Sequence, residues 1–276
     1  MTEINEYNDI WDIHATNYLQ RSRNRKFNAL LTQGIFTRLD ICLVMTDVLL
    51  KHYSSFPHLK QGIAFLKVPM TVDLKRFNNP EVIDYLHQPY IAYCGSGGFF
   101  TNGVDILIRS FAVLSEEFPD TKLYIAAFWG QDGPKMLELI KETGMTERII
   151  YLGSLPRESI PSFLHGAEVL ALPRPDSRQA QGGFPTKLGE YLASGRPVCV
   201  TKVGEIPAYL QNNESAFLSE PGNIESYVDS LRIALTNRSL AKRVGENGRK
   251  VAETVFNMEI QARHIADLLK EKVNSG

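Results

Sequence analysis

The residues of this chain best suited to binding a phosphorylated ligand lie at the start of a helix expected from Thr186. Thr186 can accept a hydrogen bond from an early backbone N–H as the N-cap. The free N–H groups of the first turn, together with the helix dipole, form a site for an anion. Lys187 adds a positive charge there, and Glu190 follows one turn later on the same face. A carboxylate beside a phosphate site suits a ribose next to a diphosphate.

The same residues also have a purely structural explanation. A helix that docks on a sheet can carry Lys187 and Glu190 as solvated side chains, and the local pattern alone favours this explanation. The choice therefore depends on what the rest of the chain brings to the start of this helix.

The composition is that of an ordinary soluble protein. The chain has 276 residues, of which 43% are hydrophobic and 22% are charged, and its formal net charge is −1. This balance gives no reason to expect a nucleic-acid partner. No apolar run is long enough to span a bilayer, and the polar, acidic start is not a secretory signal. Three cysteines in apolar runs (Cys42, Cys94 and Cys199) indicate reduced thiols and a cytoplasmic location.

The first part of the chain gives a short series of elements before a polar break at 78–89. A basic run at 21–26 is typical of a solvated surface. The pattern then predicts a helix, strand, helix, strand and connecting loop, at 27–38, 41–45, 47–53, 63–68 and 72–77. The break is the best candidate for a domain boundary.

From residue 90 onward, apolar strands alternate regularly with helices. Strands are expected at 90–94, 122–128, 148–152, 169–172, 197–201 and 215–218. Helices are expected at 104–118, 135–143, 159–165, 205–211, 224–236, 238–254 and 258–272, besides the one that begins near Thr186. This order predicts an α/β fold, a Rossmann-like parallel sheet with helices on both faces and right-handed crossovers.

Two loops of this sheet should converge. A glycine loop at 95–98 and the loop at 173–187 both follow strands. Ligands of such sheets bind at the carboxyl ends of the strands, where both loops must lie. This convergence favours a binding role for Lys187 and Glu190, although a glycine-rich loop is by itself a weak signal.

Four motifs in order resemble those of a known family over about residues 38–272. They are Val68–Phe77, similar to an interlobe "Pro-Asn-Gly-Val-Asp…Phe"; Tyr93–Gly95 with Asn102–Ile108; Val203–Pro207, similar to "Val-Gly-Gly-Ile-Pro"; and Arg243–Arg249 followed by Phe256-Asn257. The family is that of the family-4-type retaining glycosyltransferases, or glycosyl transferases group 1, which have two Rossmann-like lobes (GT-B type). The resemblance is mainly to the C-terminal lobe.

The resemblance implies a nucleotide-diphosphate sugar as donor substrate, with no other cofactor and no bound metal. Glu190 matches the family's ribose-binding glutamate, and Gly183–Thr186 matches the backbone that contacts the donor. The resemblance and the converging loops together give these expected substrate-binding residues: Gly95, Ser96, Arg174, Arg178, Gly183, Phe184, Pro185, Thr186, Lys187, Leu188 and Glu190. No catalytic residue can be assigned.

The sequence departs from the family pattern at three points. Gly182 stands where the family has its first motif glutamate, and the family's diphosphate-neutralising Arg and Lys fall near Ser96 and Asn102. The same loop presents Arg174, Arg178 and Lys187, which could substitute for these charges. Only about 88 residues precede the boundary, fewer than a full acceptor lobe needs.

The expected organisation is an incomplete N-terminal acceptor-side lobe with linker at 1–88, a nucleotide-sugar-binding lobe at 89–255, and a C-terminal helix at 256–276 that crosses back. The expected function is transfer of a sugar to a glycan or lipid-linked acceptor in surface polysaccharide synthesis. Peripheral membrane association or a partner subunit would be compatible with it. The alternative is a nucleotide-sugar-binding module that needs a partner lobe for catalysis.

Overall fold

The computed structural model describes residues 34–78, 89–96, 102–128 and 130–274. The basic run at 21–26 and most of the helix expected at 27–38 lie outside these residues.

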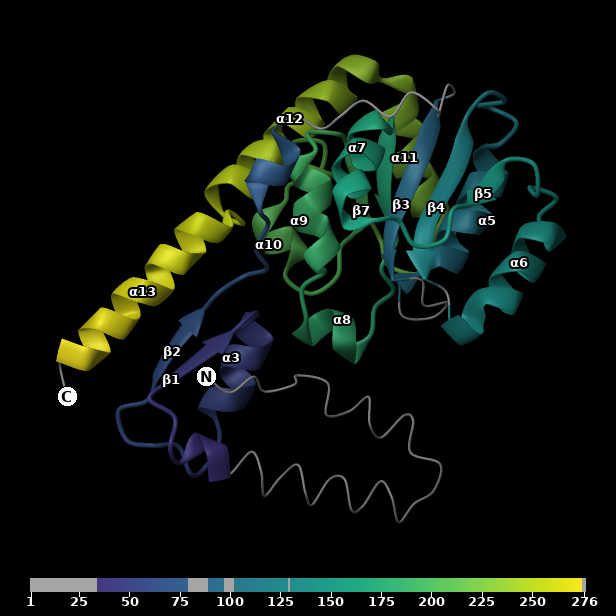
Figure 1. Cartoon of the computed structure of the whole chain (residues 1–276). Coiled ribbons are helices and arrows are strands. Elements are labelled where there is room, and N and C mark those ends of the chain that lie inside the picture. Colours follow the sequence, from purple (N-terminus) through teal and green to yellow (C-terminus); the bar gives the residue numbers. More distant parts are fainter. Residues whose placement is uncertain (1–33, 79–88, 97–101, 129, 275–276) are drawn as a thin grey trace, which may run out of the picture.

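A parallel sheet of six strands forms the larger unit of the molecule (Figure 1). Its strands, in the order β5-β4-β3-β6-β7-β8, confirm the expected α/β class. They are β3 (Tyr90–Ser96), β4 (Lys122–Phe128), β5 (Ile149–Tyr151), β6 (Val169–Leu172), β7 (Val198–Thr201) and β8 (Phe217–Ser219).

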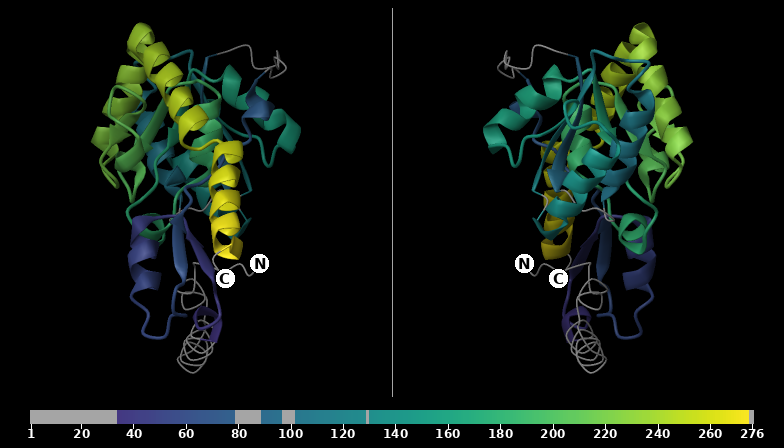
Figure 2. Two further views of the ribbon diagram at one scale, coloured as in Figure 1. Left: turned by 90° about the vertical axis from the view of Figure 1, so that its left-hand side faces the viewer. Right: turned by 90° about the vertical axis from the view of Figure 1, so that its right-hand side faces the viewer.

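Helices cover both faces of this sheet (Figures 1 and 2). One face carries α5 (Val104–Leu114), α6 (Gly133–Glu142) and α11 (Ile224–Thr236), and the other carries α7 (Ile160–Gly166) and α9 (Thr186–Ala193). Two short helices, α8 (Arg178–Gly182) and α10 (Ile206–Tyr209), lie in loops that follow strands, and α12 (Arg238–Thr254) packs against α9 and α11. Within the described ranges, every helix is too short or too polar to cross a bilayer.

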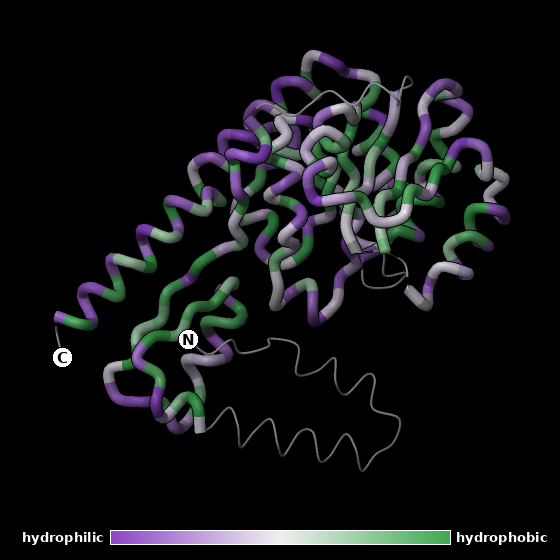
Figure 3. Tube along the Cα trace, viewed as in Figure 1, coloured by the Kyte–Doolittle hydropathy of each residue, from purple (hydrophilic) through white to green (hydrophobic). Residues whose placement is uncertain are grey.

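The strands are apolar along their whole length because both sides of the sheet are covered. All four residues of β6 are at most 1% exposed, and those of β7 are equally buried. The hydrophobic segments gather in the interior of the larger unit (Figure 3).

The strand order reverses between β3 and β6. From β3 the chain proceeds through α5 to β4 on one side, whereas from β6 it proceeds through α9 to β7 on the other. Ligands of doubly wound sheets bind in the crevice at such a point, outside the carboxyl ends of the strands. The ends of β3 and β6 therefore define where a site is expected.

A smaller unit precedes this sheet. It contains a two-stranded parallel sheet of β1 (Ile41–Val44) and β2 (Ala64–Lys67) with α3 (Asp47–Ser54) between them. It has its own apolar cluster, in which Phe36 stacks on Tyr53 with ring centroids 5.2 Å apart.

The two units touch beside α3. The Thr46 hydroxyl donates to the Gly182 carbonyl at 2.7 Å, and the Phe184 N–H points to the Met45 sulfur at 3.2 Å. The buried Glu205 carboxylate accepts from the Asp47 N–H and lies 3.6 Å from the Lys67 ammonium. The end of the large unit that carries α8 therefore faces the small unit (Figure 1).

The chain crosses between the units twice, at neighbouring places. The Val72 N–H donates to the Phe256 carbonyl at 2.8 Å, and the Met258 N–H donates to the Val72 carbonyl at 3.2 Å. A 3-10 turn, η1 (Leu74–Phe77), follows on the first crossing. Helix α13 (Met258–Asn274) runs from the second crossing to the small unit, where the Lys272 ammonium donates to the Gly62 carbonyl at 2.6 Å (Figures 1 and 2). These contacts show that the C-terminal helix returns to the small unit, and the division at 1–88, 89–255 and 256–276 stays a proposal.

Several element boundaries differ from those expected. Helix α5 ends at Leu114, four residues before the expected end at Phe118. The apolar spacing continues to Phe118, but the backbone there forms turns instead of a helix. The loop expected at 173–187 contains α8, which the Ser177 side chain caps. Part of the connecting loop expected at 72–77 is the turn η1.

Candidate functional site

Lys187 brings its ammonium to the carboxyl end of β3. Its Nζ donates to the Tyr93 hydroxyl at 2.8 Å and to Asn102 Oδ1 at 3.3 Å, and it lies 4.7 Å from the centroid of the Tyr93 ring. A Cβ on Gly95, whose φ is +156°, would lie 2.7 Å from this Nζ. The absence of a side chain at Gly95 thus makes room for the ammonium at the switch point.

This ammonium is poorly solvated. The pKa of Lys187 is lowered from 10.5 to about 8, mainly by burial and in addition by the Arg174 guanidinium, while the Cys94 thiol acts in the opposite direction. The Arg174 guanidinium is therefore near enough for its positive charge to repel that of Lys187. An anion bound beside Lys187 would relieve this repulsion and the incomplete solvation of the ammonium.

Glu190, one turn after Lys187, is paired. Its Oε1 accepts from the Arg76 guanidinium at 2.5 Å, and the two side chains are 29% and 19% exposed. Burial raises the pKa of the Cys94 thiol to about 12, and of the two neighbouring charges Glu190 raises this pKa and Lys187 lowers it. Lys187 and Glu190 thus flank the end of β3, with a positive and a negative group on the same helix.

A buried tyrosine fixes α9 to this strand. The Tyr191 hydroxyl donates to the Cys94 carbonyl at 3.0 Å and accepts from the Cys94 N–H at 2.7 Å. Both bonds lie in the core, where unpaired polar groups are costly. Tyr191 therefore fixes the height of α9 along β3, and with it the positions of the two charged residues.

The loops after β3 and β6 meet closely. Gly103, which precedes α5, has φ +68°, and a Cβ there would lie 1.8 Å from the Pro173 carbonyl oxygen. Only glycine permits this approach together with this backbone conformation. This contact lies outside the glycine loop expected at 95–98; the expected convergence of 95–98 with 173–187 is seen where Gly95 meets the Lys187 side chain.

The expected cap of α9 is wrong. Thr186 is the first helical residue and is exposed; Pro185 occupies the N-cap position, and no side-chain hydrogen bond caps the helix. The extended conformation of Pro185 starts the helix at Thr186, one residue earlier than a Thr186 cap would require. The first turn still directs backbone N–H groups to the carboxyl edge of the sheet.

The two loop arginines differ in placement. Arg174 is 8% exposed; its Nη2 donates to the Gln179 carbonyl at 3.2 Å, and its own carbonyl accepts from the Thr201 hydroxyl at 2.5 Å. Arg178 is the first residue of α8 and is exposed. The structure therefore places Arg174 beside Lys187 and Arg178 on the surface of the loop helix.

Four of the remaining expected residues, Gly183, Phe184, Pro185 and Leu188, are buried. The side chains of Phe184 and Leu188 belong to the apolar core, where Phe184 packs against Tyr209 and Phe256. Ser96 is the last residue of β3.

Three residues that contact the Lys187 or Glu190 side chain were not predicted from the sequence as site residues: Arg76, Tyr93 and Asn102. Arg76 is 114 positions from Glu190, so no local pattern could have joined them. Tyr93 and Asn102 lie within a motif used for the family resemblance, but their side chains gave no signal of a contact with Lys187.

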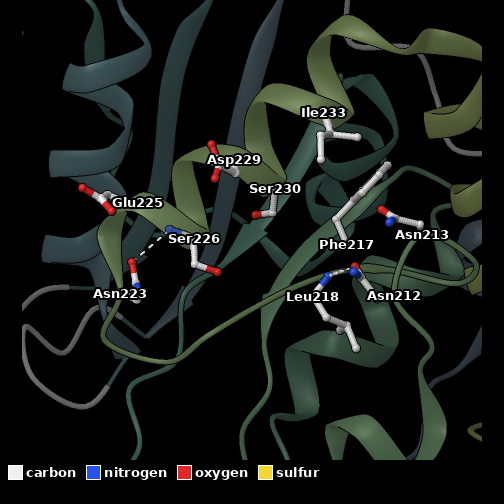
Figure 4. Close-up of a pocket in the computed structure, with 10 residues that line it drawn as sticks. All are labelled: Asn212, Asn213, Phe217, Leu218, Asn223, Glu225, Ser226, Asp229, Ser230 and Ile233. Carbon is white, nitrogen blue, oxygen red and sulfur yellow. Dashed lines mark hydrogen bonds between the residues drawn. The ribbon is translucent and has the colours of Figure 1, made fainter.

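Two other features lie apart from this cluster. Among the described residues, no group of three or more metal-ligating side chains is positioned to hold a metal ion. A polar pocket lies between the edge strand β8 and α11, lined among others by Asn212, Asn223, Ser226 and Asp229 (Figure 4). It contains none of the expected substrate-binding residues.

Comparison with known proteins supplies a family. The family model described as glycosyl transferases group 1 matches residues 83–251. The D-inositol 3-phosphate glycosyltransferase of Corynebacterium glutamicum (strain R) is 25% identical over 193 residues, covering 68% of this chain and 44% of that protein. The MMP alpha-(1->4)-mannosyltransferase of Mycolicibacterium hassiacum is 28% identical over 193 residues, covering 70% and 44%. The chain thus spans less than half the length of these relatives.

Solved structures share the fold. HepE of Anabaena, solved in complex with UDP and glucose, matches with a TM-score of 0.75 at 15% identity, over 89% of this chain and 67% of that one.

Proposed function

Since the chain belongs to the glycosyl transferases group 1 family, we propose that it binds a nucleotide-diphosphate sugar and serves in transfer of the sugar to a glycan or lipid-linked acceptor. The observation that carries this proposal is the position of the Lys187 ammonium, which lies at the switch point of the sheet against Gly95. The diphosphate of the donor would bind there.

Lys187 compensates for charges that this sequence lacks. The family's diphosphate-neutralising residues fall near Ser96 and Asn102, and the Lys187 ammonium contacts the Asn102 side chain directly. A cation supplied from α9 would thus serve in place of the one that the family pattern supplies from the loop after β3. Arg174 adds a second positive group in the same region.

Glu190 would accept hydrogen bonds from the ribose hydroxyls. It lies one helical turn from Lys187, on the helix whose first N–H groups carry no side-chain cap. A ribose and a diphosphate are adjacent parts of one nucleotide, so this spacing suits a single ligand.

The same groups suit the chemistry of transfer. Negative charge accumulates on the leaving diphosphate as the sugar departs, and groups already placed to meet that charge lower the barrier. The Lys187 ammonium, the Arg174 guanidinium and the start of α9 are such groups. Their effect is stronger in a partly buried site than in water.

Transfer also requires a positioned acceptor, since orientation supplies much of the rate. The described part of the small unit offers two strands and one helix for this purpose. We therefore propose that the chain binds the donor by itself and transfers the sugar efficiently only when further acceptor-side structure is supplied. The proposed role is surface polysaccharide synthesis. We propose that the chain acts there together with a partner subunit or at a membrane surface.

Calorimetry with UDP and uridine tests the donor site. Glu190→Ala should weaken both ligands by about 1–3 kcal/mol, because ribose hydroxyls lose their acceptor. Lys187→Ala should weaken UDP far more than uridine. Glu214→Ala and Lys202→Ala, at exposed positions that are not among the expected substrate-binding residues, serve as charge-matched controls.

Equal losses of UDP and uridine in Lys187→Ala would mean that Lys187 supports α9 without contacting phosphate. Unchanged binding in both site variants, or no nucleotide binding by the parent chain, would contradict the proposed site.

A further inference from the structure

Arg76 reaches the candidate donor site from outside the large sheet. It lies on η1, in the segment that joins the two units. One guanidinium nitrogen, Nη1, donates to Glu190 Oε1 at 2.5 Å, and the other, Nη2, donates to the Arg157 carbonyl at 2.8 Å. The guanidinium is thus held at two points of the large unit that are distant in sequence.

The backbone that carries Arg76 is also fixed in place. The Asp73 side chain caps η1 by accepting from the Lys75 N–H at 3.1 Å, and Val72 is bonded on both sides to the second crossing segment. Because the backbone and the guanidinium are both fixed, Arg76 can hold the Glu190 carboxylate in one orientation. A planar guanidinium loses little freedom in such a contact.

The contact leaves Glu190 able to bind a ligand. An ionised carboxylate offers about four acceptor positions, and the contacts seen for Arg76 use Oε1. Oε2 and the second lone pair of Oε1 can still accept from two ribose hydroxyls. The positive charge also offsets the repulsion between the Glu190 carboxylate and a diphosphate nearby.

From this geometry we infer that Arg76 is a positioning residue, which orients the Glu190 carboxylate to receive the ribose hydroxyls of the nucleotide. The inference rests on the proposed function, because it requires that Glu190 binds ribose. It makes the segment between the two units part of the donor site.

The test compares UDP with 2′,3′-dideoxy-UDP, which lacks the hydroxyls in question. Affinities are measured by calorimetry for the parent chain, Glu190→Gln, Arg76→Gln, Arg76→Lys and the double variant Arg76→Gln/Glu190→Gln. The ratio of the two affinities on one protein reports contact with the hydroxyls, whatever the stability of that protein. Arg249→Gln is the control, since Arg249 also bonds to this segment, at the Phe77 carbonyl, but pairs with Glu253.

The parent chain should prefer UDP, and Glu190→Gln should lower that preference about tenfold or more. Arg76→Gln should lower it about three- to tenfold, Arg76→Lys should restore part of it, and the double variant should be no worse than Glu190→Gln alone. Arg249→Gln should leave it unchanged.

The outcomes separate the two proposals. If Glu190→Gln abolishes the preference and Arg76→Gln retains it or binds UDP more tightly, the positioning role is wrong and the donor site stands. If the two single losses add in the double variant, Arg76 does not act through Glu190, and the inference fails. If the parent chain shows no preference or binds no UDP, both proposals fail.

Discussion

Nucleoside diphosphate binding should draw a proton onto Lys187. The pKa of Lys187 in the free protein is lowered to about 8 by burial and by Arg174. A bound diphosphate would bring negative charge to the ammonium and raise this pKa toward its ordinary value. Binding near this pH must therefore be coupled to proton uptake.

The number of protons taken up on binding follows from how much of Lys187 is neutral in the free protein and in the complex. With a pKa of about 8 in the free protein, about half of the Lys187 side chains are neutral at pH 8 and about a tenth at pH 7. If the bound pKa is near 10, uptake should be about 0.1 proton at pH 7 and about 0.5 at pH 8. Affinity should then fall as the pH rises from about 8 to 10, approaching tenfold per unit.

The free protein should show the converse effect on stability. Between the lowered pKa and 10.5 the unfolded chain binds more protons than the folded one, so the free energy of unfolding should rise with pH across this window. At neutral pH the charged side chain costs the fold up to about 3 kcal/mol, from 1.36 kcal/mol per pKa unit. Lys187→Met should therefore melt at a higher temperature than the parent chain at pH 7 while binding UDP more weakly.

Calorimetry at pH 8 in two buffers of different ionisation enthalpy measures the uptake directly. Lys187→Met should abolish it, whereas Lys202→Met, which removes an exposed ammonium paired with Glu220, should not. Uptake that persists in Lys187→Met, or a parent chain that binds UDP with no proton change at pH 8, would mean that Lys187 does not gain a proton when the nucleotide binds.

Two further predictions concern the frame of the site. Gly103→Ala, whose Cβ would meet the Pro173 carbonyl oxygen at 1.8 Å, should destabilise the fold by more than about 2 kcal/mol in denaturant titration. Gly144→Ala, at a similar φ but in open space, should cost only about 1 kcal/mol, and equal costs would contradict the close approach. Glu205→Ala should destabilise by about 1–3 kcal/mol because it removes the acceptor of the Asp47 N–H and the partner of Lys67. A loss no larger than that of the exposed control Glu214→Ala would mean that Glu205 does not join the units.

The order of helices and strands could be predicted from the sequence because parallel strands that are covered on both faces must be apolar throughout. The run Val169–Leu172 and the helices at 224–236 and 238–254 were predicted with the boundaries that the structure has. A local rule failed at the start of α9. Thr186 is a better cap than Pro185 by residue type, yet the backbone of Pro185 sets the start of α9.

The candidate site was predictable in its location but not in its partners. A strand–loop–helix pattern places Gly95 and Lys187 at one edge, because the fold class decides which strand ends meet. It cannot show that the Lys187 ammonium lies on the Tyr93 ring, or that Glu190 meets an arginine from the interlobe segment. Those contacts depend on side-chain packing between distant segments, which no spacing in the sequence encodes.

A nucleoside diphosphate is proposed to bind where β3, the loop after β6 and α9 meet, and a crystal structure of the chain with UDP would show whether it does. We expect the diphosphate against the Lys187 ammonium and the backbone at Gly95, and the ribose hydroxyls on the Glu190 carboxylate. UDP bound in the pocket between β8 and α11, or bound at the switch point with its ribose away from Glu190, would contradict it.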